Sequence, residues 1–182
     1  MTGKDIKRAV ARIAERIAAG GKNIVFSGAG ISTESGIPDY RSQGGIWDRF
    51  RPVYFNEFMT ARKSREEYWR RWADLYDGLC RAAPNPAHAA VARLCAAGLI
   101  DAVITQNVDG LHQASGVEDD RIIELHGNTR RIRCLQCRQV VLTEEVRKRL
   151  AAGDAAPACT CGGYLKPDTV SFGQAMPAAA VD

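Results

Sequence analysis

A short apolar segment that runs directly into Gly28-Ala29-Gly30 constrains the fold more than any other feature of this sequence. Residues 23–27 contain β-branched and aromatic side chains and predict a buried strand. The two glycines let backbone N–H groups approach a bulky anion, because no Cβ stands in the way. A short helical turn from Ile31 would add its positive N-terminal end, which suits a pyrophosphate. A purely structural turn between strand and helix explains the same glycines equally well.

The turn departs from the usual dinucleotide-binding fingerprint. Thr33 stands where the third glycine is expected, and no second strand and acidic residue follow about 20 residues later. Gly36 and Pro38 interrupt the chain instead, and a polar loop continues through Gly45. The sequence therefore predicts a dinucleotide-binding turn followed by an inserted lid.

The composition is that of a globular protein with one ordinary domain and a small insert. Of the 182 residues, 46% are hydrophobic and 25% are charged, which excludes a disordered chain. The net charge of +4 is modest, so nucleic acid is not indicated as a partner. No apolar segment approaches the roughly 20 residues of a membrane span, so we expect no membrane partner. The sequence makes no prediction of the oligomeric state.

Apolar periodicity predicts alternating helices and strands, as in an α/β fold. Helices are expected over residues 4–19, 64–81 and 86–97, and further strands over 99–105 and 122–125. Ser64 is the expected N-cap of the second helix, whose aromatic residues we expect in the core or in a cleft wall. Residues 50–60 predict one or two small helices.

Polar side chains follow two of the predicted strands. Gln106, Asn107 and Asp109 come after the second strand, where ligands of open parallel sheets bind, although a helix cap explains them equally well. His126 follows the third strand and can act as a general base near neutral pH, or can be an ordinary turn residue. His112 is a weaker candidate, and His88 is expected to be structural.

Four of the six cysteines form two close pairs at metal-ligand spacing. The pairs are Cys134 with Cys137 and Cys159 with Cys161. Four thiolates suit a tetrahedral structural Zn²⁺ with no open coordination position, and such thiols favour a reducing cytoplasm. Two disulfides or buried free thiols are the alternatives. Cys80 and Cys95 are expected to be small core residues.

Five motifs in this order together resemble the sirtuin family. They are GAGISTESGIPDYR from Gly28, TQNVDGLH from Thr105, ELHGN from Glu124, the cysteine pairs, and PDTVSFG from Pro167. PNPAH at 84–88 also matches. The resemblance implies a Rossmann-like domain with an inserted zinc module and NAD in the cleft between them. It implies removal of acetyl or other acyl groups from protein lysines, with nicotinamide and O-acyl-ADP-ribose as products.

The resemblance also implies a role for individual residues. The pyrophosphate would lie on the glycine turn, the nicotinamide beside Asn107 and Asp109, and His126 would be the general base, with Asn107 as a second catalytic residue. The residues implied to contact NAD are Gly28, Ala29, Gly30, Ile31, Ser32, Ile37, Pro38, Asp39, Tyr40, Arg41, Gln106, Asn107, Asp109 and His126. Val170, Ser171, Phe172 and Gly173 would form the strand that pairs with an acetylated protein or peptide substrate.

This sequence departs from the family pattern in three respects. Tyr40 stands where Phe is more common, and the second cysteine pair has one intervening residue where two are usual. The chain also ends at Asp182, before the segments that bind the adenosine half of NAD in the family, so we expect a fragment of a longer protein. Relatives that prefer acidic acyl groups carry Tyr and Arg where Trp72 and Leu75 stand here, so acetyl is the expected acyl group.

We therefore expect three regions in the chain. Residues 1–128 would begin a Rossmann-like NAD-binding domain, residues 129–168 would form the zinc-binding module, and residues 169–182 would return to the large domain. The expected function is NAD-dependent protein-lysine deacetylation. The alternatives are mono-ADP-ribosyl transfer, or a non-catalytic zinc-bearing binding module.

Overall fold

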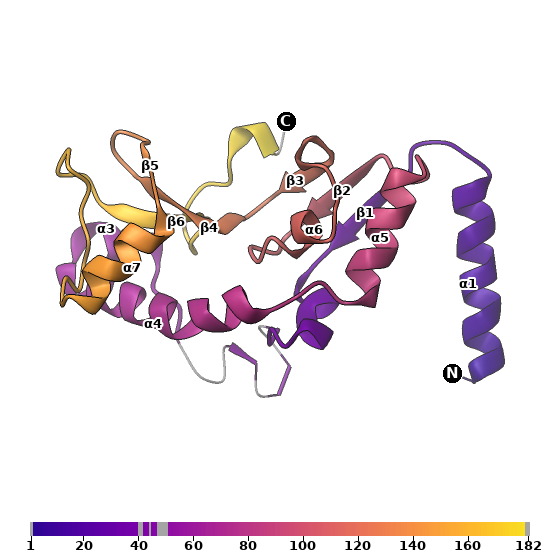
Figure 1. The fold of residues 1–182 in the computed structure, drawn as a ribbon, viewed down its shortest axis with the longest axis horizontal. Helices are drawn as coiled ribbons and strands as arrows, with labels where there is room; N and C mark the ends of the chain where they lie inside the picture. Colours follow the sequence, from indigo (N-terminus) through magenta and orange to yellow (C-terminus); the bar gives the residue numbers. More distant parts are fainter. Residues whose placement is uncertain (1, 40–41, 44, 47–50, 181–182) are drawn as a thin grey trace.

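The computed structural model describes residues 2–39, 42–43, 45–46 and 51–180, which form two groups of helices and strands (Figure 1). One group contains a parallel sheet with α5 and α6, and the other contains an antiparallel sheet with α3, α4 and α7. The predicted α/β fold class is confirmed. None of the described helices has both the length and the apolar character needed to cross a membrane.

The parallel sheet has the strand order β1-β2-β3, with β1 at Ile24–Ser27, β2 at Ala102–Thr105 and β3 at Ile122–Glu124. Thr105 lies opposite both Ser27 and Glu124, so the three carboxyl ends meet at one edge. All three strands were predicted, but β2 is shorter than expected. Leu99 and Ile100 form the turn after α5 instead, because their backbone N–H groups both donate to the carbonyl of Leu94.

Helix α5 (Pro86–Ala96) covers this sheet. Asn85 caps it as predicted, since its Oδ1 accepts from the backbone N–H groups of Ala87 and His88. Cys95 of α5 packs with Val103 of β2, Ile100 and Val117 in a small buried cluster. This cluster fixes the helix against the sheet.

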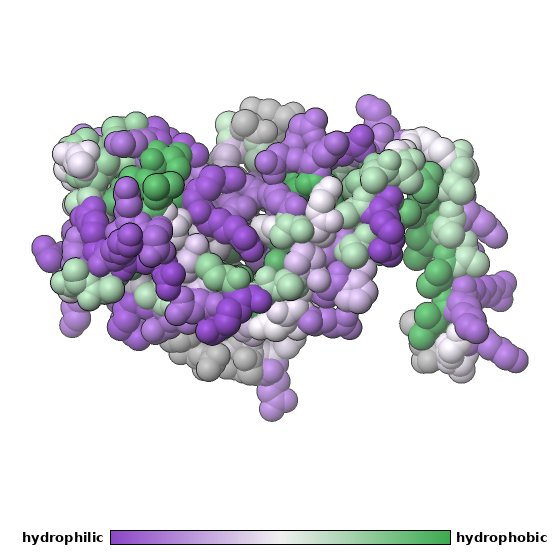
Figure 2. All heavy atoms as spheres, in the orientation of Figure 1, coloured by the Kyte–Doolittle hydropathy of each residue, from purple (hydrophilic) through white to green (hydrophobic). Residues whose placement is uncertain are grey.

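Helix α1 (Gly3–Ala18) confirms the predicted N-terminal helix, but its apolar face is exposed. Thr2 and Asp5 form a capping box at its start. Ile6, Val10 and Ile13 are exposed, and no residue of α1 is buried by the described part of the chain. Figure 2 shows a hydrophobic band on the side of α1 that faces the rest of the molecule.

The antiparallel sheet has β4 (Gly127–Cys134) between β5 (Val140–Val141) and β6 (Leu165–Thr169). Helix α7 (Thr143–Ala151) contributes Val146 to the core of this group, and α3 (Phe55–Thr60) contacts α4. Helix α4 (Arg62–Arg81) packs its aromatic stripe against the sheet: Trp69, Trp72 and Tyr76 share a core with Ile132, Val146 and Leu165.

One expectation about α4 is wrong. The helix begins at Arg62, so Ser64 lies inside its first turn and is not the N-cap. Of the two positions expected for the aromatic residues, core or cleft wall, Trp72 takes the core, because it is buried and its indole N–H donates to Thr129 Oγ1 at 3.1 Å. Leu75 is half-buried. The comparison of Trp72 and Leu75 with the Tyr and Arg of relatives that prefer acidic acyl groups therefore gains no support from the structure.

The two sheets are joined where β4 leaves β3 and crosses the end of β6. Gly127 has a φ of 73°, and a Cβ added there would lie 2.0 Å from the carbonyl oxygen of Asp168. Next to it, the carbonyl of His126 accepts a hydrogen bond from the Val170 N–H at 2.9 Å. Glycine is required at this crossing for both its conformation and its size.

We expect Gly127→Ala to destabilise the fold by more than about 3 kcal/mol, because the backbone must separate to admit a Cβ. Gly116→Ala is the matched control, since Gly116 has a φ of 99° but a Cβ there meets no atom within 4 Å. The control should lose only about 1–2 kcal/mol from conformational strain. Denaturant unfolding of both variants tests this, and equal losses would contradict the close crossing.

Candidate active site and metal centre

The glycine turn follows β1 directly and faces open space. The 3-10 helix η1 (Ala29–Ser35) begins at Ala29, two residues earlier than the predicted start at Ile31. Gly28 has an ordinary φ of −139°, Gly30 lies outside the left-handed region, and a Cβ at either residue would meet no atom within 4 Å. Neither backbone strain nor packing within the described chain explains these glycines. A ligand that approaches the backbone closely does explain them.

Ser32, Asn107 and Asp109 meet at the edge where the parallel strands end. Ser32 Oγ donates to Asp109 Oδ2 at 2.7 Å, and Asn107 Nδ2 donates to Ser32 Oγ and to the carbonyl of Gly28, both at 3.2 Å. All three side chains are buried. The structure thus brings together polar residues that lie more than 70 positions apart in sequence.

Asp109 also forms a local turn bond at the start of the helix that follows. Its Oδ1 accepts from the backbone N–H of Leu111 at 2.9 Å, the first residue of α6 (Leu111–Ala114), whose N-cap is Gly110. One carboxylate oxygen therefore bonds to the helix start and the other accepts from Ser32, so the local and the long-range explanations of this segment are compatible.

His126 lies in the turn between β3 and β4, half-buried, beside the same edge. Its Nδ1 lies 2.9 Å from the carbonyl oxygen of Gln106, which can only accept. The proton of the neutral ring is therefore on Nδ1, and Nε2 keeps its lone pair. This arrangement suits a general base that acts through Nε2.

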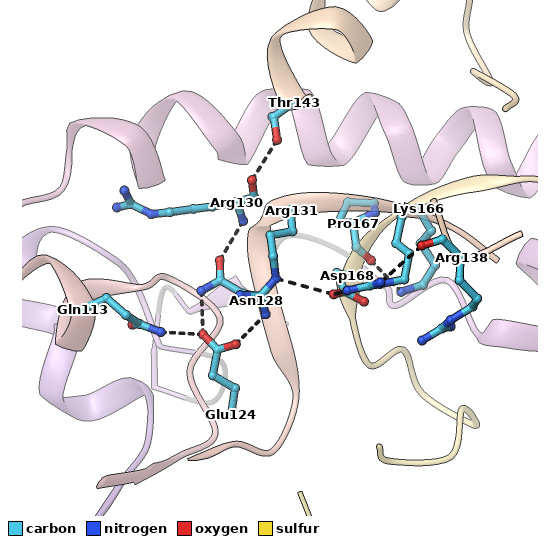
Figure 3. Close-up of polar contacts among 11 residues, drawn as sticks. Gln113, Glu124, Asn128, Arg130, Arg131, Arg138, Thr143, Lys166, Pro167 and Asp168 are labelled. Carbon is cyan, nitrogen blue, oxygen red and sulfur yellow. Dashed lines mark hydrogen bonds and ion pairs between the residues drawn. The ribbon is translucent and has the colours of Figure 1, made fainter. Parts of the chain in front are cut away.

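A polar network centred on Glu124 joins residues on both sides of the His126 turn (Figure 3). Glu124 accepts from Gln113 Nε2 at 2.7 Å and from Asn128 Nδ2 at 2.6 Å, and it pairs with Arg131 at 2.6 Å. Arg131 also pairs with Asp168 of β6 at 3.5 Å. The residues on both sides of His126 are therefore bound to α6, β4 and β6. The sequence does not predict this network, because its members are spread over four separate elements.

Other residues predicted to contact NAD are partly described. Ile37 is half-buried, Pro38 is exposed, and Asp39 is half-buried and accepts from Ser42. Tyr40 and Arg41 lie outside the described residues, so the structure does not place them.

Residues 170–173 form a turn and not the predicted strand. Strand β6 ends at Thr169, the Gln174 N–H donates to the carbonyl of Ser171 at 2.9 Å, and Gly173 has a φ of 79°. Phe172 is half exposed, and its carbonyl accepts from the Phe55 N–H at 2.9 Å. Pairing with a substrate strand stays a prediction for this segment.

His88 and His112 are buried, in agreement with the expected structural role of His88. Their exposed fractions are 0% and 2%, and their rings stack edge to face with centroids 5.2 Å apart. Burial lowers the pKa of both imidazoles, and Asp109 opposes this shift. Both rings are therefore uncharged at neutral pH.

The four paired cysteines form one cluster at the end of the antiparallel sheet. All four sulfur atoms lie within 4.8 Å of one another. Cys134 Sγ is 3.6 Å from Cys161 Sγ, and Cys137 Sγ is 3.7 Å from Cys159 Sγ. Sulfurs at about 2.3 Å from a tetrahedral Zn²⁺ lie about 3.8 Å apart, so these residues fit the metal.

The backbone around the cluster also fits a thiolate-bound cation. The N–H groups of Gln136 and Cys137 point at Cys134 Sγ, and the Gly163 N–H points at Cys161 Sγ. Burial raises the pKa of the Cys134 thiol, but these backbone donors outweigh it and bring the pKa to about 6. A Cβ at Gly163 would lie 2.7 Å from Cys134 Sγ, so only glycine allows this close approach.

All six cysteines are free, which removes the disulfide alternative. Cys95 is buried as predicted, but Cys80 is exposed and is not a core residue. With four thiolates, a bound zinc ion has no open position for substrate.

We expect purified protein to contain one equivalent of zinc, and Cys159→Ser to lose both the metal and several kcal/mol of stability. Cys80→Ser is the matched control, because its thiol is exposed and outside the cluster. Elemental analysis and thermal unfolding measure the two effects. Less than half an equivalent of zinc in folded wild-type protein would contradict the four-thiolate site.

Comparison with known proteins agrees with this geometry. The Sir2 family model matches residues 28–182. An NAD-dependent protein deacetylase 1 from Bradyrhizobium diazoefficiens is 46% identical over 178 residues, which cover 97% of this chain and 70% of that protein. The NAD-dependent protein deacetylase of Thermodesulfovibrio yellowstonii is 49% identical over 156 residues, covering 85% of this chain and 60% of that protein.

Solved structures give the same result. The structure titled "Sir2-p53 peptide-NAD+" matches with a TM-score of 0.81 at 34% identity, covering 93% of this chain and 67% of that chain. A Sir2Tm structure bound to a propionylated peptide matches with a TM-score of 0.80 at 34% identity, over 94% of this chain and 67% of that chain. This chain therefore spans about 60–70% of the length of these four relatives. The paired cysteines, the glycine turn and the converging polar residues are thus those of a member of the Sir2 family of NAD-dependent protein deacetylases.

Proposed function

We propose that this chain carries the nicotinamide, acyl-lysine and zinc portions of an NAD-dependent protein-lysine deacetylase. The observation that carries the proposal is the meeting of Ser32, Asn107 and Asp109 beside an open glycine turn, with His126 bound through Nδ1 to the carbonyl of Gln106 so that Nε2 can act as a base. The matched relatives include a structure with NAD and a peptide. An acetylated lysine of a protein or peptide is the proposed substrate, and O-acetyl-ADP-ribose and nicotinamide are the proposed products.

Bound NAD supplies an electrophilic ribose carbon, so no nucleophilic side chain or catalytic metal is required of the protein. The backbone N–H groups of Gly28–Gly30 hold the pyrophosphate without a Cβ in the way. Asn107 and Asp109 line the nicotinamide pocket, and their bonds to Ser32 hold the pocket and the turn in one geometry. Gln106 contacts the ribose and, through its carbonyl, orients His126. His126 Nε2 removes a proton from the ribose hydroxyl.

The remaining proposed contacts follow from position. Ile31, Ile37 and Pro38 line the nicotinamide pocket and Tyr40 covers it. Ser32 and Arg41 help to set the pose of NAD, which Asp39 also contacts. Val170–Gly173 contacts the substrate backbone. We also propose that residues 129–168 form the zinc-bearing module, which packs on α4, and that residues 1–128 and 169–182 belong to the NAD-binding domain. Zinc acts there as a structural ion. Four free thiols at metal-ligand spacing support a reducing compartment such as the cytoplasm.

Nicotinamide release tests the proposed reaction directly. We expect the protein as its gene encodes it to release nicotinamide from NAD when an acetylated peptide is present and not with the unacetylated peptide. Release with the unacetylated peptide, together with its ADP-ribosylation, would favour the mono-ADP-ribosyl transfer alternative. A zinc-loaded, folded protein with no release under either condition would favour the binding-module alternative.

We expect His126→Ala to lower deacetylation by about 10²–10⁴-fold, because a general base is removed. Loss of the Nδ1–H bond to Gln106 should cost only about 1 kcal/mol of stability, so zinc content and fold should stay unchanged. Exchange of labelled nicotinamide into NAD should fall less than product formation, since this exchange precedes the base-catalysed step. Deacetylation within about threefold of wild type would assign His126 a structural role only.

A further inference from the structure

Two buried nitrogen atoms beneath the site have no hydrogen-bond partner in the described residues. They are Nε2 of His88 and Nδ1 of His112. The two rings are 0% and 2% exposed, and they lie in contact between α5 and α6 with centroids 5.2 Å apart and planes at 65°. An unpaired polar group at such depth is destabilising, so two of them on rings in contact need an explanation.

The neighbours of each ring determine which nitrogen carries the proton. The backbone N–H of Asn85 donates to His88 Nδ1 at 3.3 Å, so the proton of neutral His88 is on Nε2. Ser27 Oγ donates to Thr105 Oγ1 at 2.9 Å and lies 2.9 Å from His112 Nε2. Since the Ser27 proton is already used, His112 Nε2–H donates to Ser27, and His112 Nδ1 is left as an acceptor.

The two unpartnered nitrogens are therefore complementary, because one is a donor and the other is an acceptor. The two rings are in contact, and a hydrogen bond between these nitrogens, made by a small rotation of either ring or through one buried water, would satisfy both groups. It requires both imidazoles to be neutral, since a charged ring would place a donor against a donor.

This one link would close a ring of hydrogen bonds under the glycine turn. On one side, Asn85, held by His88, donates from Nδ2 to the carbonyl of Ile31 at 2.7 Å. On the other side, His112 bonds to Ser27, and Ser27 bonds to Thr105. Thr105 Oγ1 accepts from the Asn107 N–H at 3.1 Å. Asn107 Nδ2 donates to Ser32 Oγ, and this bond completes the ring because Ser32 follows Ile31 in the chain.

We propose that His88 and His112 are positioning residues whose mutual hydrogen bond fixes the Ile31–Ser32 segment relative to Asn107, and so sets the nicotinamide end of the NAD site. Neither imidazole touches the reacting atoms. The inference rests on the proposed function for its effect on NAD, whereas the link between the rings rests on the contacts alone.

The first test observes the rings in the wild-type protein without NAD. Long-range ¹H–¹⁵N NMR spectra should show both His88 and His112 as neutral Nε2–H tautomers at neutral pH. An Nδ1–H tautomer for either ring, or a charged ring, would overturn the link. Because this measurement needs no activity and no variant, a protein that fails to bind NAD would refute the proposed function while the spectra still decide the link.

The second test separates positioning from general loss of structure. His88→Phe keeps a buried ring without the N–H donor, and we expect it to raise the KM for NAD and the inhibition constant of nicotinamide by about tenfold. The KM for the acetylated peptide should change less than about twofold, because the peptide contacts other segments. His88→Gln restores an N–H donor and an acceptor and should return both constants to within about threefold of wild type.

Cys95→Ala is the matched control, because it removes a buried side chain from the same helix about two turns further on. It should lower stability and leave all three constants unchanged. If His88→Phe lowers only kcat, as a smaller folded fraction would, or if His88→Gln gives no recovery, the positioning role is wrong.

Discussion

The hydrogen bond from Ser32 to Asp109 is the contact on which the rest of the site depends. It joins the segment after β1 to the segment after β2, and Asn107 reinforces it from the same side. The parallel pairing of β1, β2 and β3 makes the contact possible, because it places three carboxyl ends at one edge. Buried hydroxyl, amide and carboxylate groups satisfy one another there, so the pocket keeps its shape without a metal or a disulfide.

Much of this fold follows from local sequence patterns. Asn85 and Pro86 predict the start of α5, apolar runs predict the three parallel strands, and cysteine spacing predicts the four-sulfur cluster. Each of these features depends on residues close together in sequence. The same holds for the glycine turn, whose open surroundings the structure now shows.

The sequence does not predict features that form where segments far apart in the chain come into contact. The burial of Trp72 depends on β4 and α7, which pack against α4 but lie far from it in sequence. The contact between the rings of His88 and His112 depends on the contact of α5 with α6. The turn at 170–173 depends on the positive φ of Gly173 and on the hydrogen bond from the Phe55 N–H to the Phe172 carbonyl. Neither feature can be recognised from the pattern of apolar residues in the sequence.

The position of His126 combines information from both sheets. Its ring is held by the carbonyl of Gln106, which follows β2, whereas its backbone carbonyl is held by Val170, which follows β6. The hydrophobic cluster around Val103 and the cluster around Ile132 share no residue, so each sheet has its own packing. The bonds at His126, the close crossing at Gly127, and the hydrogen bonds from Thr129 and Arg130 to the carbonyls of Val108 and Asp109 join the two sheets. The zinc cluster lies at the far end of β4 from this crossing, which explains how a structural ion can stabilise one sheet without entering the chemistry at the other.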